Sequence, residues 1–218
     1  MSVKTTLLAL GMLAAIVLVG CMEQAGSMRV RVASGTRYAE VPSDDTTLTG
    51  CVKWYEDTIT MGEVVRTYGD IKWGYKEVSG RAWPRTDGFC HFEVPYINLD
   101  QSVPTCTLFY YQKGHLDYPN VYVKWLYTVE DWPGDAEELF WAIQNSDNDS
   151  MITNSITYQQ NGLHSVALLP FGNQLVARFA NAGGGYLITG WEYPGSSYDY
   201  WTSVAGVGDS SPYIKICY

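Results

Sequence analysis

The segment Val121-Tyr122-Val123-Lys124-Trp125-Leu126-Tyr127 carries the strand pattern that decides the fold class. Its side chains alternate, so Val121, Val123, Trp125 and Tyr127 would share one face of a half-buried strand. Shorter runs with aromatic and β-branched residues, bounded by Gly, Pro, Asp or Asn, predict further strands. These runs are residues 28–32, 51–55, 71–73, 89–94, 107–111, 165–169, 174–180, 185–191 and 213–218.

Residues 135–143 instead predict one short helix. Asp135 can cap its first turn, Glu137 and Glu138 favour the N-terminal end of the helix dipole, and apolar residues follow. Many short strands, 21 glycines and a single helix favour an all-β fold, an antiparallel sandwich. No linker-like segment interrupts residues 28–218, so we expect one domain there.

The N-terminal segment has the layout of a bacterial secretory signal. Lys4 precedes an apolar and small-residue stretch over residues 7–19, which ends in Leu18-Val19-Gly20-Cys21. As a helix this stretch would span ~20 Å, too short for a hydrocarbon core of ~30 Å. The segment resembles bacterial lipoprotein signals, which implies that residues 1–20 are removed and that Cys21 becomes the acylated N-terminus. Residues 21–27 would then form a short tether of ~13 Å.

The charge of the chain limits its partners. The chain has 14 basic and 23 acidic residues, and loss of Lys4 with the signal would bring the net charge from −9 to −10. This acidity argues against nucleic acid and against adsorption onto an anionic bilayer. We expect an extracytoplasmic protein held at a bacterial membrane by lipid on Cys21. Met22 is not the aspartate that marks inner-membrane retention, which favours the outer membrane or cell surface.

The remaining cysteines are even in number, which favours two disulfides outside the cytoplasm. They are Cys51, Cys90, Cys106 and Cys217. Three connectivities are possible. We favour Cys51–Cys217 with Cys90–Cys106, because Cys90 and Cys106 are expected on strands that are consecutive in the chain.

Four motifs occur in an order that resembles the DNRLRE-type domain family. They are Tyr68-Gly69-Asp70-Ile71-Lys72-Trp73-Gly74, Arg85-Thr86-Asp87-Gly88-Phe89-Cys90-His91-Phe92-Glu93-Val94 followed by Pro95-Tyr96-Ile97, Thr107-Leu108-Phe109-Tyr110-Tyr111, and Pro212-Tyr213-Ile214-Lys215-Ile216-Cys217-Tyr218. The resemblance covers about residues 60–218, with Glu93 where the family has Asp. It implies a jelly-roll β-sandwich related to sugar-binding modules of bacterial and archaeal surface proteins.

Catalytic patterns are lacking in the sequence. The histidines His91, His115 and His164 have no metal-helix spacing, and no Gly-x-Ser-x-Gly elbow occurs. We therefore expect a protein that is not an enzyme and needs no cofactor. Asp147, Asn148 and Asp149 offer oxygen ligands that suit a structural calcium ion, although a polar turn capped by its own side chains explains them as well.

Eight tryptophans and seventeen tyrosines are many for this length, and several gather in residues 190–201. These rings would form a glycan-binding groove if exposed, or fill the core if buried. The candidate ligand-binding residues are Trp191, Glu192, Tyr193, Tyr198, Asp199 and Trp201.

The sequence thus predicts a membrane-anchored binder of a polysaccharide or another cell-surface component. A structural or adhesive subunit that joins other proteins through strand edges is the alternative. A glycan-active hydrolase is a weaker one.

We predict that mass spectrometry of the mature protein will find acylated Cys21 as its first residue, because a lipoprotein signal is cleaved directly before the cysteine that carries the lipid. Cys21→Ala should release the protein from the membrane or leave the uncleaved precursor. An unmodified N-terminus elsewhere in the mature chain would contradict the prediction.

Overall fold

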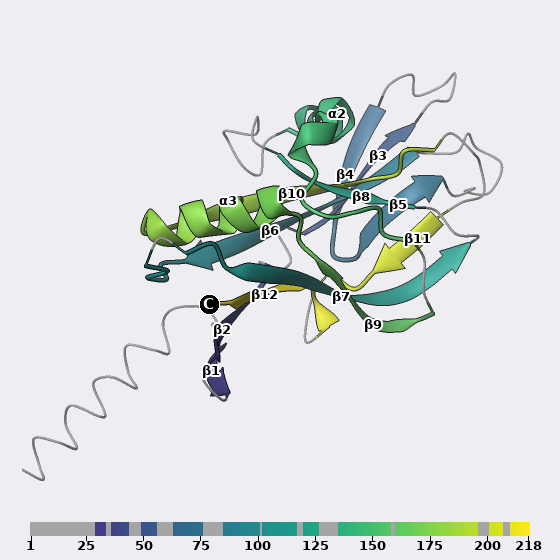
Figure 1. Cartoon of the computed structure of the whole chain (residues 1–218). Helices are drawn as coiled ribbons and strands as arrows, with labels where there is room; N and C mark the ends of the chain where they lie inside the picture. Colours follow the sequence, from purple (N-terminus) through teal and green to yellow (C-terminus); the bar gives the residue numbers. More distant parts are fainter. Residues whose placement is uncertain are drawn as a thin grey trace, which may run out of the picture.

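The computed structural model describes residues 29–33, 36–43, 49–55, 63–75, 85–100, 102–116, 120–126, 135–157, 160–195, 201–206 and 210–218. Within these ranges most residues belong to antiparallel strands, and two α-helices pack on the sheet (Figure 1). The predicted signal (1–20) and tether (21–27), with Cys21, lie outside the described residues. No helix in the described part of the chain is both long and apolar enough to cross a membrane.

The strands are β1 (Arg29–Ala33), β2 (Thr36–Pro42), β3 (Gly50–Tyr55), β4 (Glu63–Tyr68), β5 (Ile71–Tyr75), β6 (Arg85–Pro95), β7 (Thr105–Leu116), β8 (Tyr122–Trp125), β9 (Gly162–Ala167), β10 (Gly184–Glu192), β11 (Trp201–Val204) and β12 (Tyr213–Cys217). Their order in the sheet is β1-β2-β12-β7-β11-β5-β6-β10-β8. Strand β3 joins β6 and β4, and β9 joins β7.

This sheet curls back on itself. Strand β6 pairs with β5 at its start, and an isolated bridge from Ser43 to Phe92 brings the end of β2 to the same strand. The path β2-β12-β7-β11-β5-β6 therefore returns to its beginning. Closure of this kind satisfies backbone groups that an open edge would leave unpaired.

A second connection links β8 to the region after β9. Lys124 bridges Met151, Val121 bridges Ile156, and Thr153 bridges Leu168. The extended segment 151–156 thus lies between two parts of the sheet that are distant in sequence.

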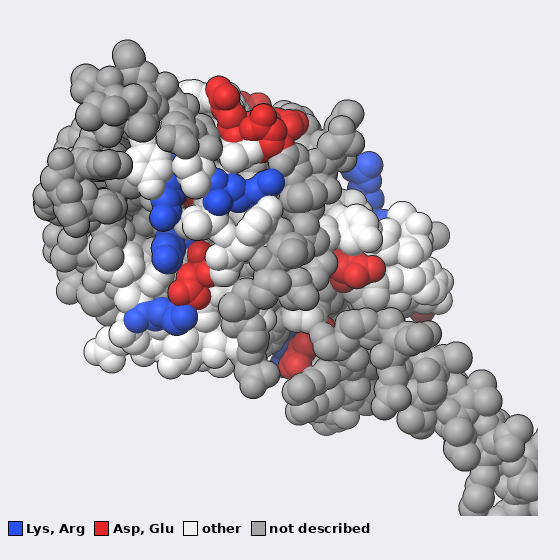
Figure 2. All heavy atoms as spheres, turned by 180° about the vertical axis from the view of Figure 1, so that it is seen from behind, with Lys and Arg blue, Asp and Glu red and all other residues white. Residues whose placement is uncertain are grey.

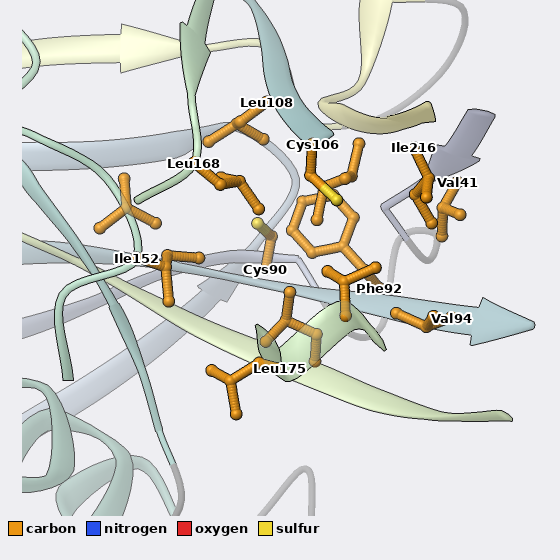
Figure 3. Close-up of a cluster of buried hydrophobic side chains, with 14 of the residues drawn as sticks. Val41, Cys90, Phe92, Val94, Cys106, Leu108, Ile152, Leu168, Leu175 and Ile216 are labelled. Carbon is orange, nitrogen blue, oxygen red and sulfur yellow. The ribbon is translucent and has the colours of Figure 1, made fainter. Parts of the chain in front are cut away.

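The main core fills the inside of the curled sheet. Cys90, Phe92 and Val94 project from one face of β6 into a cluster with residues of β2, β7, β12 and α3 (Figure 3). On β10, which pairs with β6, Leu187 and Trp191 are fully buried in the same cluster. The alternation of buried side chains on neighbouring strands builds one continuous apolar interior.

Helix α2 (Ala136–Asn145) matches the predicted helix, and Asp135 caps it by accepting a hydrogen bond from the Glu137 backbone N–H at 2.6 Å. It covers the outer face of β3 and β10. Its buried residues join a second cluster with side chains from the sheet, which comprises Val52, Phe89, Leu126, Leu139, Phe140, Ile143 and Ile188.

The strand predicted for residues 174–180 is wrong, because this segment belongs to helix α3 (Pro170–Asn181). Pro170 occupies the first turn, where its missing N–H costs nothing. Gly172, Leu175, Val176 and Ala180 are buried, and their spacing forms one helical face. The described residues are mostly antiparallel strand, as the expected all-β class requires, and they contain two α-helices where one was predicted.

Strands β3 and β4 approach each other closely at Gly50. A Cβ at this position would lie 2.1 Å from the Thr67 carbonyl oxygen, whereas at Gly114 the nearest atom, in the Trp201 ring, is 3.5 Å away. We predict that Gly50→Ala lowers the free energy of unfolding by roughly 1–3 kcal/mol, as overpacking does. Urea denaturation should show a much smaller change for Gly114→Ala. Equal effects of the two substitutions would contradict this reading of the strand contact.

Candidate functional site

The predicted aromatic cluster of residues 190–201 does not form an exposed groove in its described part. Trp191 is 0% exposed, and its ring packs against Trp73 and Tyr110 with centroids 5.6 Å and 6.0 Å away. Its indole N–H donates to the Cys90 sulfur at 3.3 Å. Tyr193 is also buried. These two rings belong to the core, which is the alternative that the sequence had left open.

The other predicted members lie apart from them. Tyr198 and Asp199 fall outside the described residues. Trp201 is half-buried at the start of β11, where it pairs with Gly74 of β5 and Leu116 of β7.

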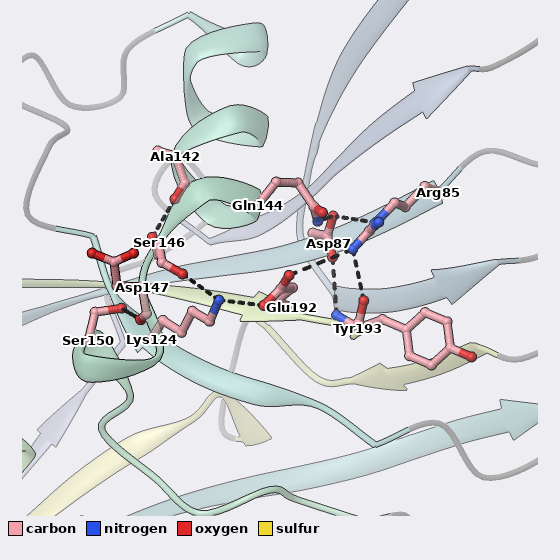
Figure 4. A network of polar contacts seen from close by, with 10 residues as sticks. All are labelled: Arg85, Asp87, Lys124, Ala142, Gln144, Ser146, Asp147, Ser150, Glu192 and Tyr193. Carbon is pink, nitrogen blue, oxygen red and sulfur yellow. Dashed lines mark hydrogen bonds and ion pairs between the residues drawn. The ribbon is translucent and has the colours of Figure 1, made fainter. Parts of the chain in front are cut away.

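Glu192, the last residue of β10, belongs to a partly buried network of charges (Figure 4). We call Arg85, Asp87, Lys124, Gln144 and Glu192 the charge network. Strand β6 supplies Arg85 and Asp87, β8 supplies Lys124, and the end of α2 supplies Gln144. Three strands and a helix end therefore meet at one polar cluster on the α2 side of the sheet.

Asp87 is at the centre of this network and is 0% exposed. The Gln144 amide nitrogen donates to Asp87 Oδ2 at 2.6 Å, and the Tyr193 backbone N–H donates to Oδ1 at 3.2 Å. Arg85 Nε lies 3.5 Å from Oδ2. Every polar contact to this carboxyl group thus comes from a donor.

The second half of the network joins β8 to β10. Lys124 Nζ lies 2.6 Å from Glu192 Oε2 and donates to the Ser146 carbonyl oxygen at 2.7 Å. Arg85 Nη2 lies 3.7 Å from Glu192 Oε1 and donates to the Tyr193 carbonyl oxygen at 2.9 Å. Lys124, only 3% exposed, is therefore a buried cation with its charge compensated.

Burial raises the pKa of Asp87 from its ordinary value of 3.8 to about 7, while Arg85 and the hydrogen bonds from Tyr193 and Gln144 oppose the shift. Nearby Glu192 raises it further. A carboxyl group that titrates near neutrality is typical of functional sites, although ion-pair networks that serve structure produce it too.

The predicted metal loop folds as a short turn. Asp147 precedes the 3₁₀ helix η1 (Asn148–Ser150) and accepts at its carbonyl oxygen from the Ser150 backbone N–H and hydroxyl. The side chains of Asp147, Asn148 and Asp149 are exposed. No group of three His, Cys, Asp or Glu residues suited to a metal ion occurs among the described residues. Calcium binding by this loop stays a prediction.

The four described cysteines are free thiols, so the structure does not contain the predicted pairs Cys51–Cys217 and Cys90–Cys106. Strands β6 and β7 are consecutive in sequence, yet β5 and β11 separate them in the sheet. Cys90 hydrogen-bonds Thr189 at 3.0 Å instead. Burial raises the pKa of Cys90 and of Cys106 to about 12, which suppresses the reactive thiolate.

Exposed aromatic residues lie elsewhere, at the end of the β6–β10 pair. Tyr96, directly after β6, is 61% exposed, and Tyr186 on β10 is 56% exposed. Tyr186 is paired with the exposed Glu93 of β6, and its ring stacks on His91 with centroids 4.7 Å apart. We call Glu93, Tyr96 and Tyr186, with His91 against Tyr186, the aromatic surface.

The aromatic surface was not predicted, because the sequence prediction considered aromatic residues concentrated in one segment, residues 190–201. The available signal was the alternation along β10, which places Tyr186 on the face opposite Leu187 and Trp191. His91, one of the three histidines that lack metal-helix spacing, is 4% exposed, and its ring stacks on that of Tyr186.

We predict that Asp87→Asn changes the pH dependence of stability. Because the folded state holds this proton up to about pH 7 and the unfolded chain only to about pH 4, the Asp87 contribution to the free energy of unfolding falls as pH rises between these values. Denaturation of both proteins across this range should show that, as pH rises, the free energy of unfolding of the variant increases relative to that of the wild type by on the order of a few kcal/mol. A difference independent of pH would refute the assignment.

No protein-family model matches this chain, and no curated protein matches its sequence.

Proposed function

We propose that this protein is a non-catalytic extracytoplasmic lipoprotein whose β-sandwich, of the jelly-roll kind, binds a polysaccharide or another cell-surface component. The segment Leu18-Val19-Gly20-Cys21, which resembles the end of a lipoprotein signal, supports the membrane anchor. The resemblance of four motifs to DNRLRE-type domains supports the sugar-binding role. The observation that carries the binding role is the aromatic surface, where Tyr96 and Tyr186 are the two most exposed large aromatic side chains of the described chain.

Tyr186 has the properties that stacking against a sugar ring requires. Its ring is more than half exposed while His91 packs against it, so the side chain loses little rotamer freedom on binding. Tyr96 lies just beyond the paired residues Pro95 and Gly184, near the same end of the strands. Tyr186 on β10 and Tyr96 after the end of β6 each offer an exposed ring that can stack on an apolar face of a sugar.

Glu93 adds the polar part of this surface. It lies directly across from Tyr186, and its exposed carboxylate can accept hydrogen bonds from sugar hydroxyl groups. The overall net charge of −9 favours neutral over anionic glycans.

The charge pattern supports a ligand other than nucleic acid. Figure 2 shows one face of the molecule, on which several basic side chains lie near one another with acidic side chains beside them, while another basic side chain lies apart. A nucleic-acid surface would instead present a broad basic area along the backbone path.

A specific observation favours the structural or adhesive alternative. Among the described strands, β9 pairs along its length only with β7, and Leu163 on it is 59% exposed. An edge strand of this kind can accept a strand from another protein. The charge network gives little support to a hydrolase, because Asp87 has no exposed surface that a glycan could reach.

We predict that Tyr186→Ala and Tyr96→Ala each weaken glycan binding by roughly tenfold or more, as loss of an aromatic hot-spot residue does. A glycan array with the purified mature protein should identify the ligand, and titration calorimetry should measure each variant. Tyr111→Ala is the matched control, because Tyr111 is an exposed tyrosine on β7, away from the β6–β10 pair.

Unchanged affinity in both aromatic variants would refute the aromatic surface as the binding site. Absence of binding to any glycan, together with capture of a protein partner that is lost when Leu163 is replaced by Asp, would favour the adhesive alternative.

A further inference from the structure

We propose that strand β9 pairs with β9 of a second copy of this chain, so that two sheets join edge to edge about a two-fold axis at His164. The occupant of the β9 edge is then another copy of the protein and not a foreign chain. This pairing does not depend on glycan binding, because β9 contributes no residue to the aromatic surface.

The backbone of β9 directs its residues alternately towards β7 and away from it. Leu168, directly after the strand, donates its backbone N–H to the Cys106 carbonyl oxygen at 2.9 Å, so the even-numbered residues of β9 face β7. On the far side of β7, the Ala205 N–H donates to the Tyr111 carbonyl oxygen at 2.9 Å. Tyr111 is in register with Leu163, so the N–H and C=O of Leu163 likewise point away from β7.

The outer edge of β9 is short. Leu163 and Ser165 direct N–H and C=O groups to this edge, where no described strand pairs with them. Beyond the strand the edge is occupied, because Leu169 donates its N–H to the Ile152 carbonyl oxygen at 2.8 Å. At the other end, Gly162 has a φ of +141°, outside the strand conformation. The free edge therefore centres on His164.

A second copy of β9 satisfies these outward groups. In an antiparallel pair about a two-fold axis at His164, Leu163 of each copy pairs with Ser165 of the other. Each such pair exchanges both N–H···O bonds, so the outward groups of both residues are used. The Leu163 side chain, which is 59% exposed, then lies beside a serine, whose small side chain leaves room for it.

The charge of the β9 edge suits a copy of an acidic chain. Residues 160–170 contain no Asp, Glu, Lys or Arg, and the β7 residues in register with the exposed face of β9 (Thr107, Phe109 and Tyr111) are uncharged as well. Two chains with a net charge of −9 repel each other where acidic side chains meet, and these residues bring none together.

The other strands at the limits of the described sheet are protected against such pairing. Strand β1 carries Arg29 and Arg31, β4 carries Glu63 and Arg66, and β8 carries Lys124. Charged residues on an edge strand hinder its pairing with another chain. Among these described strands β9 alone has no such residue, so its sequence favours an edge that becomes paired.

The contact is small, because each copy contributes one short strand. Stable interfaces bury about 1,200 Å² or more in total. We therefore expect a dimer that dissociates on dilution, with a dissociation constant in the micromolar range or weaker.

Sedimentation equilibrium of the purified mature protein, in detergent matched to the solvent density, tests the proposal. From micromolar to submillimolar concentration the mass should rise from that of one chain to that of two and no further, because the two-fold pairing uses the β9 edge of both copies. A protein that stays monomeric over this range, or one that forms open-ended assemblies, would overturn the proposal.

Two substitutions at Ser165 separate the backbone contact from the side chain. Ser165→Pro removes an N–H that points away from β7, so the folded monomer should persist. The dissociation constant of the dimer should rise roughly tenfold or more, because each copy loses a backbone hydrogen bond at the joint. Ser165→Ala keeps this N–H and is the matched control, which should dimerise as the wild type does.

Should Ser165→Pro fail to fold, Leu163→Lys tests the same edge, because it adds a charge at an exposed position. Wild-type dimerisation in folded Ser165→Pro or in Leu163→Lys would overturn the proposal. A chain that stays monomeric but binds a different protein through β9 would overturn it too, and would favour the adhesive alternative.

His164→Cys tests the position of the axis. Residues that face each other in a non-hydrogen-bonded antiparallel pair have Cα atoms ~4.5 Å apart, within the range of a disulfide. Mild oxidation should therefore link two copies of His164→Cys covalently, whereas Ala167→Cys, away from the axis, should behave as the wild type does. A covalent dimer formed by Ala167→Cys and not by His164→Cys would contradict pairing about His164.

Discussion

The pairing of β6 with β10 is the constraint on which the rest of the structure depends. Phe92 lies across from Leu187, and Gly88 across from Trp191, so both strands direct alternate side chains into one interior. The intervening residues face outwards, either under α2 or into solvent. A Cβ on Gly88 would lie 2.3 Å from the Ile71 side chain, which shows how closely the strands of the interior approach. Core, charge network and aromatic surface all follow from the register of this pair.

That register also explains why the predicted binding cluster came apart. Trp191, Glu192 and Tyr193 are neighbours in sequence, yet the strand directs Trp191 inwards and Glu192 to the opposite face, and Tyr193 is buried just beyond the strand end. The alternation rule was available from the sequence, but the rule alone does not tell which face is buried. The indole ring of Trp191 is the larger apolar group, and its burial determines the outcome. The carboxylate of Glu192 then meets cations from β6 and β8, a long-range arrangement that no linear pattern reveals.

Elements with strong local signals were predictable. The helix at residues 135–143 has an N-cap and acidic first turn, and most strands carry the expected period. Helix α3 was missed because its residues 174–180 also fit a strand of apolar and small side chains; Pro170 in its first turn was the signal that could have corrected this. The thiols are a different case. Cys90 and Cys106 lie on strands consecutive in the chain, and only the sheet order shows that these strands are not neighbours.

The strand β10 has a consequence for how this protein can change over evolution. Its side chains serve the interior on one face, and on the other they serve both the charge network at one end and the aromatic surface at the other. A one-residue insertion or deletion within β10 would exchange the two faces, sending Glu192 into an apolar interior and Trp191 into the polar cluster. Substitution can alter Tyr186 or Glu192 singly, whereas changes of length must occur outside the strand. New binding properties would therefore arise most readily by residue replacement on a strand of constant length.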